Sequence, residues 1–203
     1  MKHSFILSIA AAVWIPAAFA AEKTFDFKDP KGVNTVNFLL DAPLETISGT
    51  ANGITGTVTV DTDDPSTAKG TIIVATESLH VPNPMMKQHM LGEKWLNAAK
   101  NPEITFEVKE VSNVKAENGK GTADVTGTFT LNGVSKEITV PVSGTYLPGR
   151  LGDRMPNAKG DLLVIRAEFP IKRSDFGIQP GQNEDKVSDE IKVKLAIAGA
   201  AAE

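Results

Sequence analysis

The chain has 203 residues, of which 41% are hydrophobic and 23% are charged, and it contains no cysteine. This length is sufficient for one domain with a sizeable core, and the missing cysteine excludes disulfide bonds, thiol catalysis and thiolate metal sites. The formal net charge of −4 comes without any run of basic residues. Because phosphate backbones repel an acidic chain, we expect no nucleic-acid partner.

The first 20 residues have the three parts of a secretory signal peptide. Lys2 lies at its start, residues 5–13 are apolar, and Ala18-Phe19-Ala20 is typical of a cleavage site. We therefore predict cleavage between Ala20 and Ala21. The expected location is the periplasm, with secretion from the cell as the alternative.

The expected mature chain, residues 21–203, shows no repeat, linker or composition shift that would divide it. Because Lys2 is the only Lys or Arg in residues 1–20, cleavage leaves 20 basic and 25 acidic residues. No later stretch is apolar for long enough to predict a transmembrane helix, so we expect no stable membrane insertion. The prediction is one soluble domain.

Apolar and polar residues alternate along most of the mature chain, with the period of two that is typical of β-strands. In chain order the alternating segments are 24–27, 36–40, 54–60, 104–109, 125–131, 138–142, 163–171 and 191–197, and residues 70–74 are predicted as a more continuously apolar strand. Asn132-Gly133 is the clearest hairpin turn, because this pair readily adopts the positive φ angles of a type I′ turn. Residues 199–203 are expected to fray.

One stretch, His80 to Phe106, breaks the alternation. Met86 and Met90 lie four residues apart, so they share one face if Pro84 begins a helix. Pro102 then ends the irregular stretch. We predict a short helical insert, either as a lid over the end of a sheet or barrel or as a crossover that packs its methionines into the core.

Many strands with short turns and a single helical insert predict an all-β fold. Without strand–helix–strand repeats, the sheet is expected to be antiparallel and closed on itself as a β-barrel. A two-sheet sandwich is the alternative, because periodicity alone does not separate the two architectures.

Four segments carry a family resemblance by their order and spacing. They are Ser78–Phe106, which includes His89-Met90, Trp95-Leu96 and Pro102-Glu103-Ile104-Thr105-Phe106; Gly127–Val134; Phe169–Gly177, which includes Arg173-Ser174-Asp175-Phe176-Gly177; and Val187–Ile191. The chain resembles the YceI-like family, exported bacterial lipocalin-like barrels associated with binding long apolar chains such as polyisoprenoids. The resemblance runs from residue 24 to residue 197. It implies a lipocalin-like barrel whose helical insert closes one end.

The sequence departs from this family pattern at Asn34-Thr35, at Asp41 and at Met86-Lys87. We expect these departures to remove polar groups near the barrel mouth. The headgroup of a ligand bound by other members is therefore not carried over to this chain.

Strand parity predicts which apolar side chains point into the barrel. The predicted lining is Phe38, Ile54, Val58, Phe106, Val108, Phe129, Leu131, Ile165 and Phe169, with Met86, Met90 and Trp95 closing one end. The resemblance implies that Phe176 folds onto the same end. Ordinary core packing is the alternative for each of these residues.

His89, Arg173 and Asp175 are the predicted polar groups of the mouth. Arg173 is expected to pair either with a ligand headgroup or, as the preferred interpretation, with Asp175 and Asp189. The two histidines after residue 20 lack the spacing of a zinc site, and the acidic turn at residues 61–64 lacks the glycine and distal glutamate of a calcium loop. No catalytic motif is present, so we predict no metal, no cofactor and no catalytic residue.

Three functions are compatible with these observations. The leading prediction is a soluble carrier or sequestering protein for an isoprenoid-like or other long-chain lipid, such as a polyprenyl or quinone chain. The second is a structural or interaction module whose barrel is filled by its own side chains. The third is an enzyme that acts on a lipid headgroup. A homodimer is compatible with exposed sheet edges.

Overall fold

The computed structural model describes residues 22–203; the predicted signal peptide and its cleavage site at Ala20 and Ala21 lie outside them. The strands are β1 (Glu22–Asp26), β2 (Thr35–Asp41), β3 (Thr46–Ala51), β4 (Ile54–Asp61), β5 (Lys69–Ala75), β6 (Glu103–Glu117), β7 (Lys120–Leu131), β8 (Val134–Leu147), β9 (Gly160–Lys172) and β10 (Glu190–Ala202). The helices are α1 (Pro84–Leu91) and α2 (Leu151–Arg154), and 3-10 turns occur at Pro65–Thr67, Thr76–Ser78 and Arg173–Phe176.

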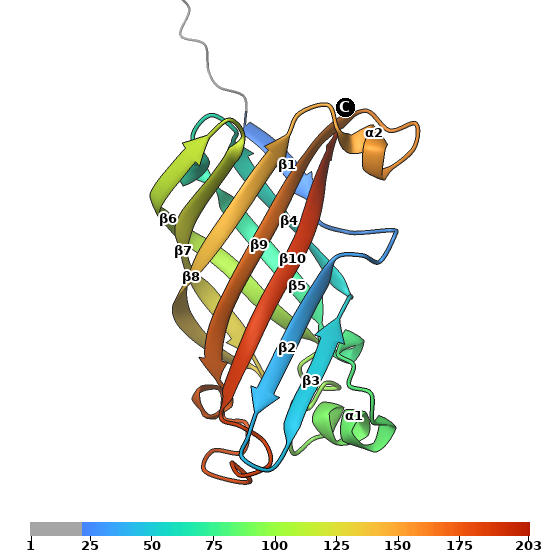
Figure 1. Cartoon of the computed structure of the whole chain (residues 1–203), viewed down its shortest axis with the longest axis vertical. Coiled ribbons are helices and arrows are strands. Elements are labelled where there is room, and N and C mark those ends of the chain that lie inside the picture. Colours follow the sequence, from blue (N-terminus) through green and yellow to red (C-terminus); the bar gives the residue numbers. More distant parts are fainter. Residues whose placement is uncertain (1–21) are drawn as a thin grey trace, which may run out of the picture.

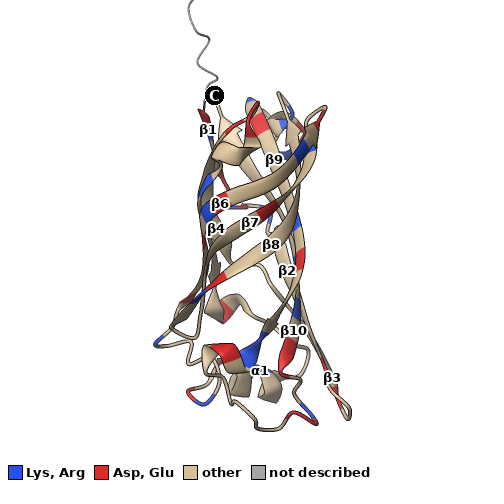
Figure 2. Cartoon of the chain, turned by 90° about the vertical axis from the view of Figure 1, so that its left-hand side faces the viewer, with Lys and Arg blue, Asp and Glu red and all other residues tan. Residues whose placement is uncertain are grey.

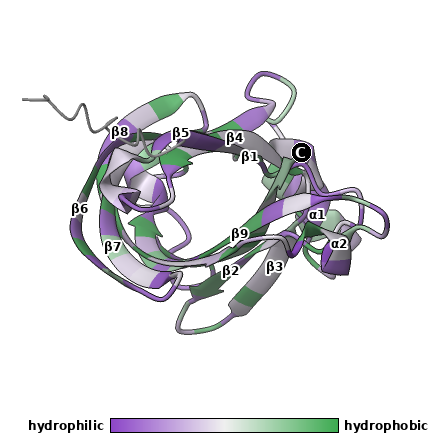
Figure 3. Cartoon of the chain, turned by 90° about the horizontal axis from the view of Figure 1, so that it is seen from above, coloured by the Kyte–Doolittle hydropathy of each residue, from purple (hydrophilic) through white to green (hydrophobic). Residues whose placement is uncertain are grey.

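All the described strands belong to one antiparallel sheet that closes on itself. The strand order is β1-β4-β5-β6-β7-β8-β9-β10-β2-β3, and the pairing of β1 with β10 completes an eight-stranded ring. Seen from above, the strands form a closed ring (Figure 3). The predicted barrel is therefore confirmed, and the sandwich alternative is wrong.

The two ends of the barrel differ (Figure 1). The end that we call the α1 end carries α1, the β2–β3 turn, the β7–β8 turn and the long β9–β10 loop. The opposite end, the α2 end, carries α2, the β4–β5 and β6–β7 turns and the C-terminus. Lys, Arg, Asp and Glu residues are spread over the strands and over the loops of both ends (Figure 2).

Local sequence explains several of the turns. Asn132 and Gly133 have φ angles of 52° and 74°, as the predicted type I′ turn requires. Helix α1 begins at Pro84, and the side chain of Asn83 accepts hydrogen bonds from the free N–H groups of its first turn. The predicted fraying of residues 199–203 is wrong, because β10 pairs with β9 as far as Ala202.

The β2–β3 hairpin extends the barrel wall at the α1 end. Both β1 and β2 pair with the same edge of β10, one after the other, so the wall splits where β1 ends and β2 begins. Sequence alternation does not reveal β3, because Ile47 and Gly49 are its only inward candidates before Ala51. The glycine is required there: a Cβ on Gly49 would lie 2.1 Å from the ring of Phe38 across the strand pair.

At the split in the wall, the side chain of Asn34 makes hydrogen bonds that a neighbouring strand would otherwise make. Its Nδ2 donates to the carbonyls of Phe27 at 3.0 Å and Ala198 at 3.1 Å, and its Oδ1 accepts the N–H of Ala198 at 2.9 Å. The amide thus pairs with β10 as a backbone peptide group would. Asn34 is buried in the wall and not near the α1-end mouth, so the expected position of that departure is wrong.

Helix α2 fixes the β1–β2 loop from outside. Arg154 donates to Oδ1 of Asn34 at 3.0 Å and forms an ion pair of 2.8 Å with Asp29. Asp29 also accepts the backbone N–H groups of Lys31, Val33 and Asn34. The loop is therefore held by side chains, without any disulfide.

The outer edge of β3 has a single strand-like contact. Thr50 and His80 exchange backbone hydrogen bonds of 2.9 and 2.7 Å, which join the hairpin to the segment ahead of α1. The rest of this edge is available for pairing with another strand. The homodimer stays a prediction.

Replacement of Asn34 by alanine should leave backbone groups of Phe27 and Ala198 without partners. Since each buried group left unpaired costs about 1–3 kcal/mol, we expect Asn34→Ala to lower the free energy of unfolding by about 2–4 kcal/mol. Urea denaturation measures the loss, and the exposed neighbour serves as control: Val33→Ala should cost less than about 0.5 kcal/mol. Equal effects of the two variants would contradict the role given to the Asn34 amide.

Candidate functional site

A cavity of about 840 Å³ runs through the barrel. Exposed residues border it at both ends: Glu45, Met85 and Lys186 at the α1 end, and Glu117 and Lys120 at the α2 end. Between the two ends its wall is overwhelmingly apolar. The cavity therefore extends along the barrel and meets solvent at both rims.

The cavity exists because the inward positions of neighbouring strands are small. Gly121 faces Gly144 across β7 and β8, and Ala123 and Ala167 also line the space. A Cβ placed on Gly144 would meet no atom within 4 Å. The inward side chains thus leave the barrel hollow in its half toward α2.

The structure places most of the predicted lining residues on the cavity wall. These are Phe38, Val58, Met86, Met90, Trp95, Phe106, Val108, Phe129, Leu131, Ile165 and Phe169. Met86 and Met90 face the interior from α1, where they border the cavity and also pack against the buried core, so both interpretations of the helical insert stay open. Whether any of these residues contacts a ligand stays a prediction.

Two predicted lining residues, Ile54 and Phe176, do not border the cavity. Ile54 is buried in a cluster with Phe25, which lies in β1, and Phe27, which follows β1. Phe176 packs edge-on against Phe129, with 5.5 Å between ring centroids. It therefore supports the cavity wall from behind, at the α1 end where the family resemblance places it.

The preferred pairing of Arg173 with Asp175 and Asp189 is wrong. Arg173 is 1% exposed, and its guanidinium donates to five backbone carbonyls of the β9–β10 loop. These carbonyls belong to Ile178, Gln179, Gln182, Val187 and Ser188. The carbonyls of this long irregular loop receive no N–H from a neighbouring strand, and one guanidinium donates to all five of them.

The acidic residues near Arg173 bind other groups. Asp189 accepts the N–H and the hydroxyl of Ser174 at 2.9 and 2.8 Å, and Asp175 forms an exposed ion pair of 2.9 Å with Lys136. Asp175 therefore does not belong to the cavity mouth. Arg173 also stacks over the ring of Trp95, 5.8 Å from its centroid, and so joins the loop to the segment that follows α1.

His89 is the predicted polar residue that does lie at the mouth. It is exposed on the last turn of α1 and borders the cavity near Asn83 and Met86. Arg173 borders the cavity too, but its donors are directed into the loop. Within residues 22–203, no three His, Asp or Glu side chains gather closely enough to hold a metal ion.

A buried polar cluster at the α2 end escaped the sequence analysis. Asp161 accepts hydrogen bonds from Lys23, from the hydroxyl of Tyr146 at 2.7 Å and from the N–H of Gly149 at 2.7 Å. Burial alone would raise the pKa of the Asp161 carboxyl, but these bonds outweigh burial and hold the pKa below its usual value. Tyr146 lines the cavity, so this cluster fixes part of its wall.

Other wall residues were missed because their strands are longer than the alternating segments. Val111 and Val114 lie beyond the predicted part of β6, where bulges shift the register twice, and Ala123 lies ahead of the predicted part of β7. Small inward residues do not stand out in a hydrophobic pattern, so the sequence did not indicate that the half of the barrel toward α2 is hollow.

Across residues 22–203, no helix has the length and apolar character needed to cross a bilayer.

Comparison with known sequences agrees with the family resemblance. The family model described as the YceI-like domain matches residues 22–198. A UPF0312 protein of Pseudomonas paraeruginosa is 32% identical over 151 residues, which are 74% of this chain and 72% of that protein. A UPF0312 protein of Yersinia pestis is 30% identical, with the same shares covered.

Solved structures show the same architecture. BcnA of Burkholderia cenocepacia matches with a TM-score of 0.65 at 22% identity, covering 81% of this chain and 95% of that one. A YCEI protein of Campylobacter jejuni gives 0.63 at 24%, covering 76% and 85%. A polyisoprenoid binding domain from Saccharophagus degradans gives 0.63 at 12%, covering 90% and 99%. At sequence identities this low, the structural similarity establishes a shared fold.

Removal of the Arg173 guanidinium should unpair the carbonyls of the β9–β10 loop. We expect Arg173→Gln to lower the free energy of unfolding by about 3 kcal/mol or more, since glutamine has two donors where arginine has five. Chemical denaturation measures the free energy of unfolding, and Lys172→Gln, a substitution of the exposed neighbouring residue, is the control. Unchanged stability together with lost lipid binding would show that Arg173 serves a headgroup instead.

The lowered pKa of Asp161 makes one part of the stability depend on pH. The pKa of the Asp161 carboxyl is lower in the folded protein than in the unfolded chain, where it is about 3.9. The stabilisation that the ionised carboxylate gives the folded state is therefore complete above about pH 3.9 and is lost as the pH falls through the folded pKa. Asp161→Asn should therefore cost about 1–3 kcal/mol at pH 7, and this cost should fall as the pH is lowered below the unfolded pKa of about 3.9.

Denaturation curves at several pH values measure this difference. Asp153→Asn, which removes an exposed carboxylate, is the matched control and should cost less than about 1 kcal/mol at any pH. A cost for Asp161→Asn that stays constant from pH 7 to pH 3 would contradict the account.

Proposed function

Because this chain belongs to the YceI-like family, we propose that its barrel binds one long apolar lipid of the isoprenoid type and acts as a carrier or sequestering protein. The observation that carries the proposal is the apolar cavity that extends from one rim of the barrel to the other. Such a space accommodates an elongated chain better than a compact molecule.

The size of the cavity supports an occupant. By the scaling measured for protein cavities, about 24 cal/mol per Å³, a dry void of 840 Å³ would cost roughly 20 kcal/mol. The net stability of a domain is about 5–15 kcal/mol, so a dry void is excluded. Either water or a ligand occupies the space, and an apolar wall favours a ligand that replaces water.

An isoprenoid chain suits this wall. Each buried methylene contributes about 0.8 kcal/mol, so a long chain binds tightly with few polar contacts. The aromatic part of the wall, with Phe129 and Phe169 edge-on at 6.3 Å between centroids, supplies flat apolar surface for methyl branches and double bonds. The polyisoprenoid-binding domain from Saccharophagus degradans, which shares the fold, adds weight to this ligand class.

The two alternative functions have less support. A structural module filled by its own side chains does not agree with a cavity of this volume. An enzyme acting on a headgroup would need a polar catalytic pair in the cavity, whereas Arg173 is committed to loop carbonyls and Asp175 to Lys136. We therefore propose a binding protein, exported through the signal peptide predicted in residues 1–20.

A bulky side chain at Gly144 should block the cavity without disturbing the wall. The position opens onto free space and has no positive φ, so Gly144→Trp places an indole inside the barrel at little cost in strain. We expect at least a ten-fold loss of affinity for a polyprenol or a long-chain quinone. Native mass spectrometry measures the bound fraction.

The matched control is Ser143→Trp, which adds the same side chain to the outward face of the same strand. It should bind lipid like the unaltered protein. Undiminished binding by Gly144→Trp, with both variants folded, would place the lipid outside this cavity.

A further inference from the structure

Large hydrophobic side chains are exposed mainly at one end of the barrel. Residues 22–203 expose four of them: Leu44 at 68%, Met85 at 67%, Val33 at 58% and Val134 at 36%. Leu44 lies in the β2–β3 turn, Met85 in the first turn of α1 and Val134 at the start of β8, all at the α1 end. Val33 lies apart from them, in the loop that Arg154 of α2 fixes.

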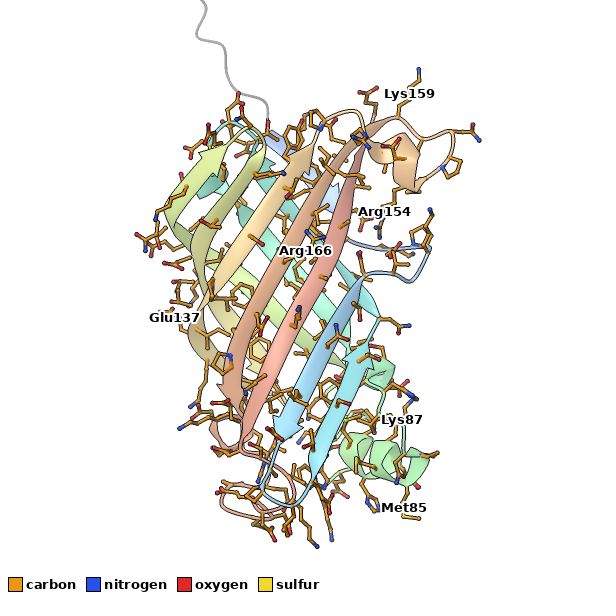
Figure 4. The ribbon with its side chains drawn as sticks, in the orientation of Figure 1. Met85, Lys87, Glu137, Arg154, Lys159 and Arg166 are labelled. Carbon is orange, nitrogen blue, oxygen red and sulfur yellow. The ribbon has the colours of Figure 1, made fainter. Side chains whose placement is uncertain are left out.

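Leu44 and Met85 border the opening of the cavity. Met85 itself lines the cavity, and so does Glu45, the neighbour of Leu44. Figure 4 shows Met85 projecting from α1 at the lower right of the molecule. The N–H of Leu44 donates to the carbonyl of Asp185 at 2.9 Å, so the turn is held against the β9–β10 loop with its leucine outward.

The opening at the α2 end has a different character. Its exposed border residues are Asp63, Ala116, Glu117, Asn118, Gly119 and Lys120, and none of the four exposed large hydrophobics of the described chain lies there. The α1 opening also has polar border residues, among them Glu45, His89 and Lys186, but Met85 borders it as well and Leu44 lies next to Glu45. The α1 end is therefore the end of the barrel that exposes large apolar side chains beside the cavity opening.

The β2–β3 hairpin and the segment ahead of α1 share one backbone contact, between Thr50 and His80. Side chains of both segments also pack in one buried cluster, among them Phe38 and Leu79. Leu44 belongs to the turn of this hairpin and Met85 to α1, so the two exposed side chains come from the two segments that meet here.

We propose that the α1 end is a docking surface for a lipid bilayer, in which Leu44 and Met85 insert among the acyl chains while the cavity opens onto the membrane. This rests on the proposed function, because a long isoprenoid remains in a bilayer and reaches a binding site efficiently only where that site faces the bilayer. Both openings have charges of both signs, Glu45 and Lys186 here and Glu117 and Lys120 at the α2 end, so the exposed leucine and methionine, and not charge, select the α1 end. Docking is then driven by apolar insertion and is insensitive to salt.

Single-site labelling tests the docking surface directly. Since the chain has no cysteine, Leu44→Cys, Met85→Cys and Val33→Cys each accept one environment-sensitive dye. With phosphatidylcholine vesicles, the dyes at positions 44 and 85 should shift to shorter wavelength and brighten, equally at low and high salt, while the dye at position 33 stays unchanged. No shift at positions 44 and 85, or the same shift at all three, overturns the proposal.

Lipid transfer separates docking from binding. Leu44→Asp alters the rim without touching a cavity residue, and Val33→Asp is its matched control. We expect Leu44→Asp to take up a polyprenol from phosphatidylcholine vesicles about ten-fold more slowly, the factor that about 1.4 kcal/mol of lost leucine insertion gives. Uptake from detergent micelles should be unchanged, and Val33→Asp should behave normally in both assays.

Unchanged uptake by Leu44→Asp from vesicles overturns the docking surface while lipid binding stands. Failure of the unaltered protein to bind the lipid from micelles overturns the proposed function, and the dye measurement still decides whether this end meets a membrane.

Discussion

The structure depends on one geometric constraint: an eight-stranded barrel encloses more space than its inward side chains fill. Strand number and stagger set the diameter, and alternation assigns every second residue to the interior. Here several of those residues are glycine or alanine, including Gly121, Ala123 and Gly144. The resulting hollow of about 840 Å³ is too large to stay dry, so either water or a ligand occupies it.

Polar side chains replace backbone pairing wherever the barrel becomes irregular. Asn34 pairs with β10 at the split in the wall, and Arg173 satisfies the carbonyls of the β9–β10 loop. Asp161 joins β1 to the β8–β9 loop at the α2 end. These three residues fix the wall without disulfides and are all buried, so they stabilise the frame of the cavity more than they contact its contents.

Sequence reasoning succeeded where local chemistry decides structure. Period-two alternation located eight of the ten described strands and a continuous apolar run located β5, while Asn132-Gly133 indicated the turn and Pro84 the start of α1. It failed where the outcome depends on distant partners. The opposite-charge rule paired Arg173 with nearby aspartates, although the carbonyls of its own loop surround it. Strand parity predicted that Ile54 lines the cavity, but Ile54 packs in a buried cluster with Phe25 and Phe27 and does not border the cavity.

The central claim is that the hollow interior holds a long apolar chain. The direct measurement is to purify the protein from its own host without detergent, extract it with organic solvent and identify the released mass. The account predicts a polyprenyl or quinone chain at close to one molecule per barrel. Protein that releases no lipid, and whose high-resolution structure shows only water in the cavity, would contradict it.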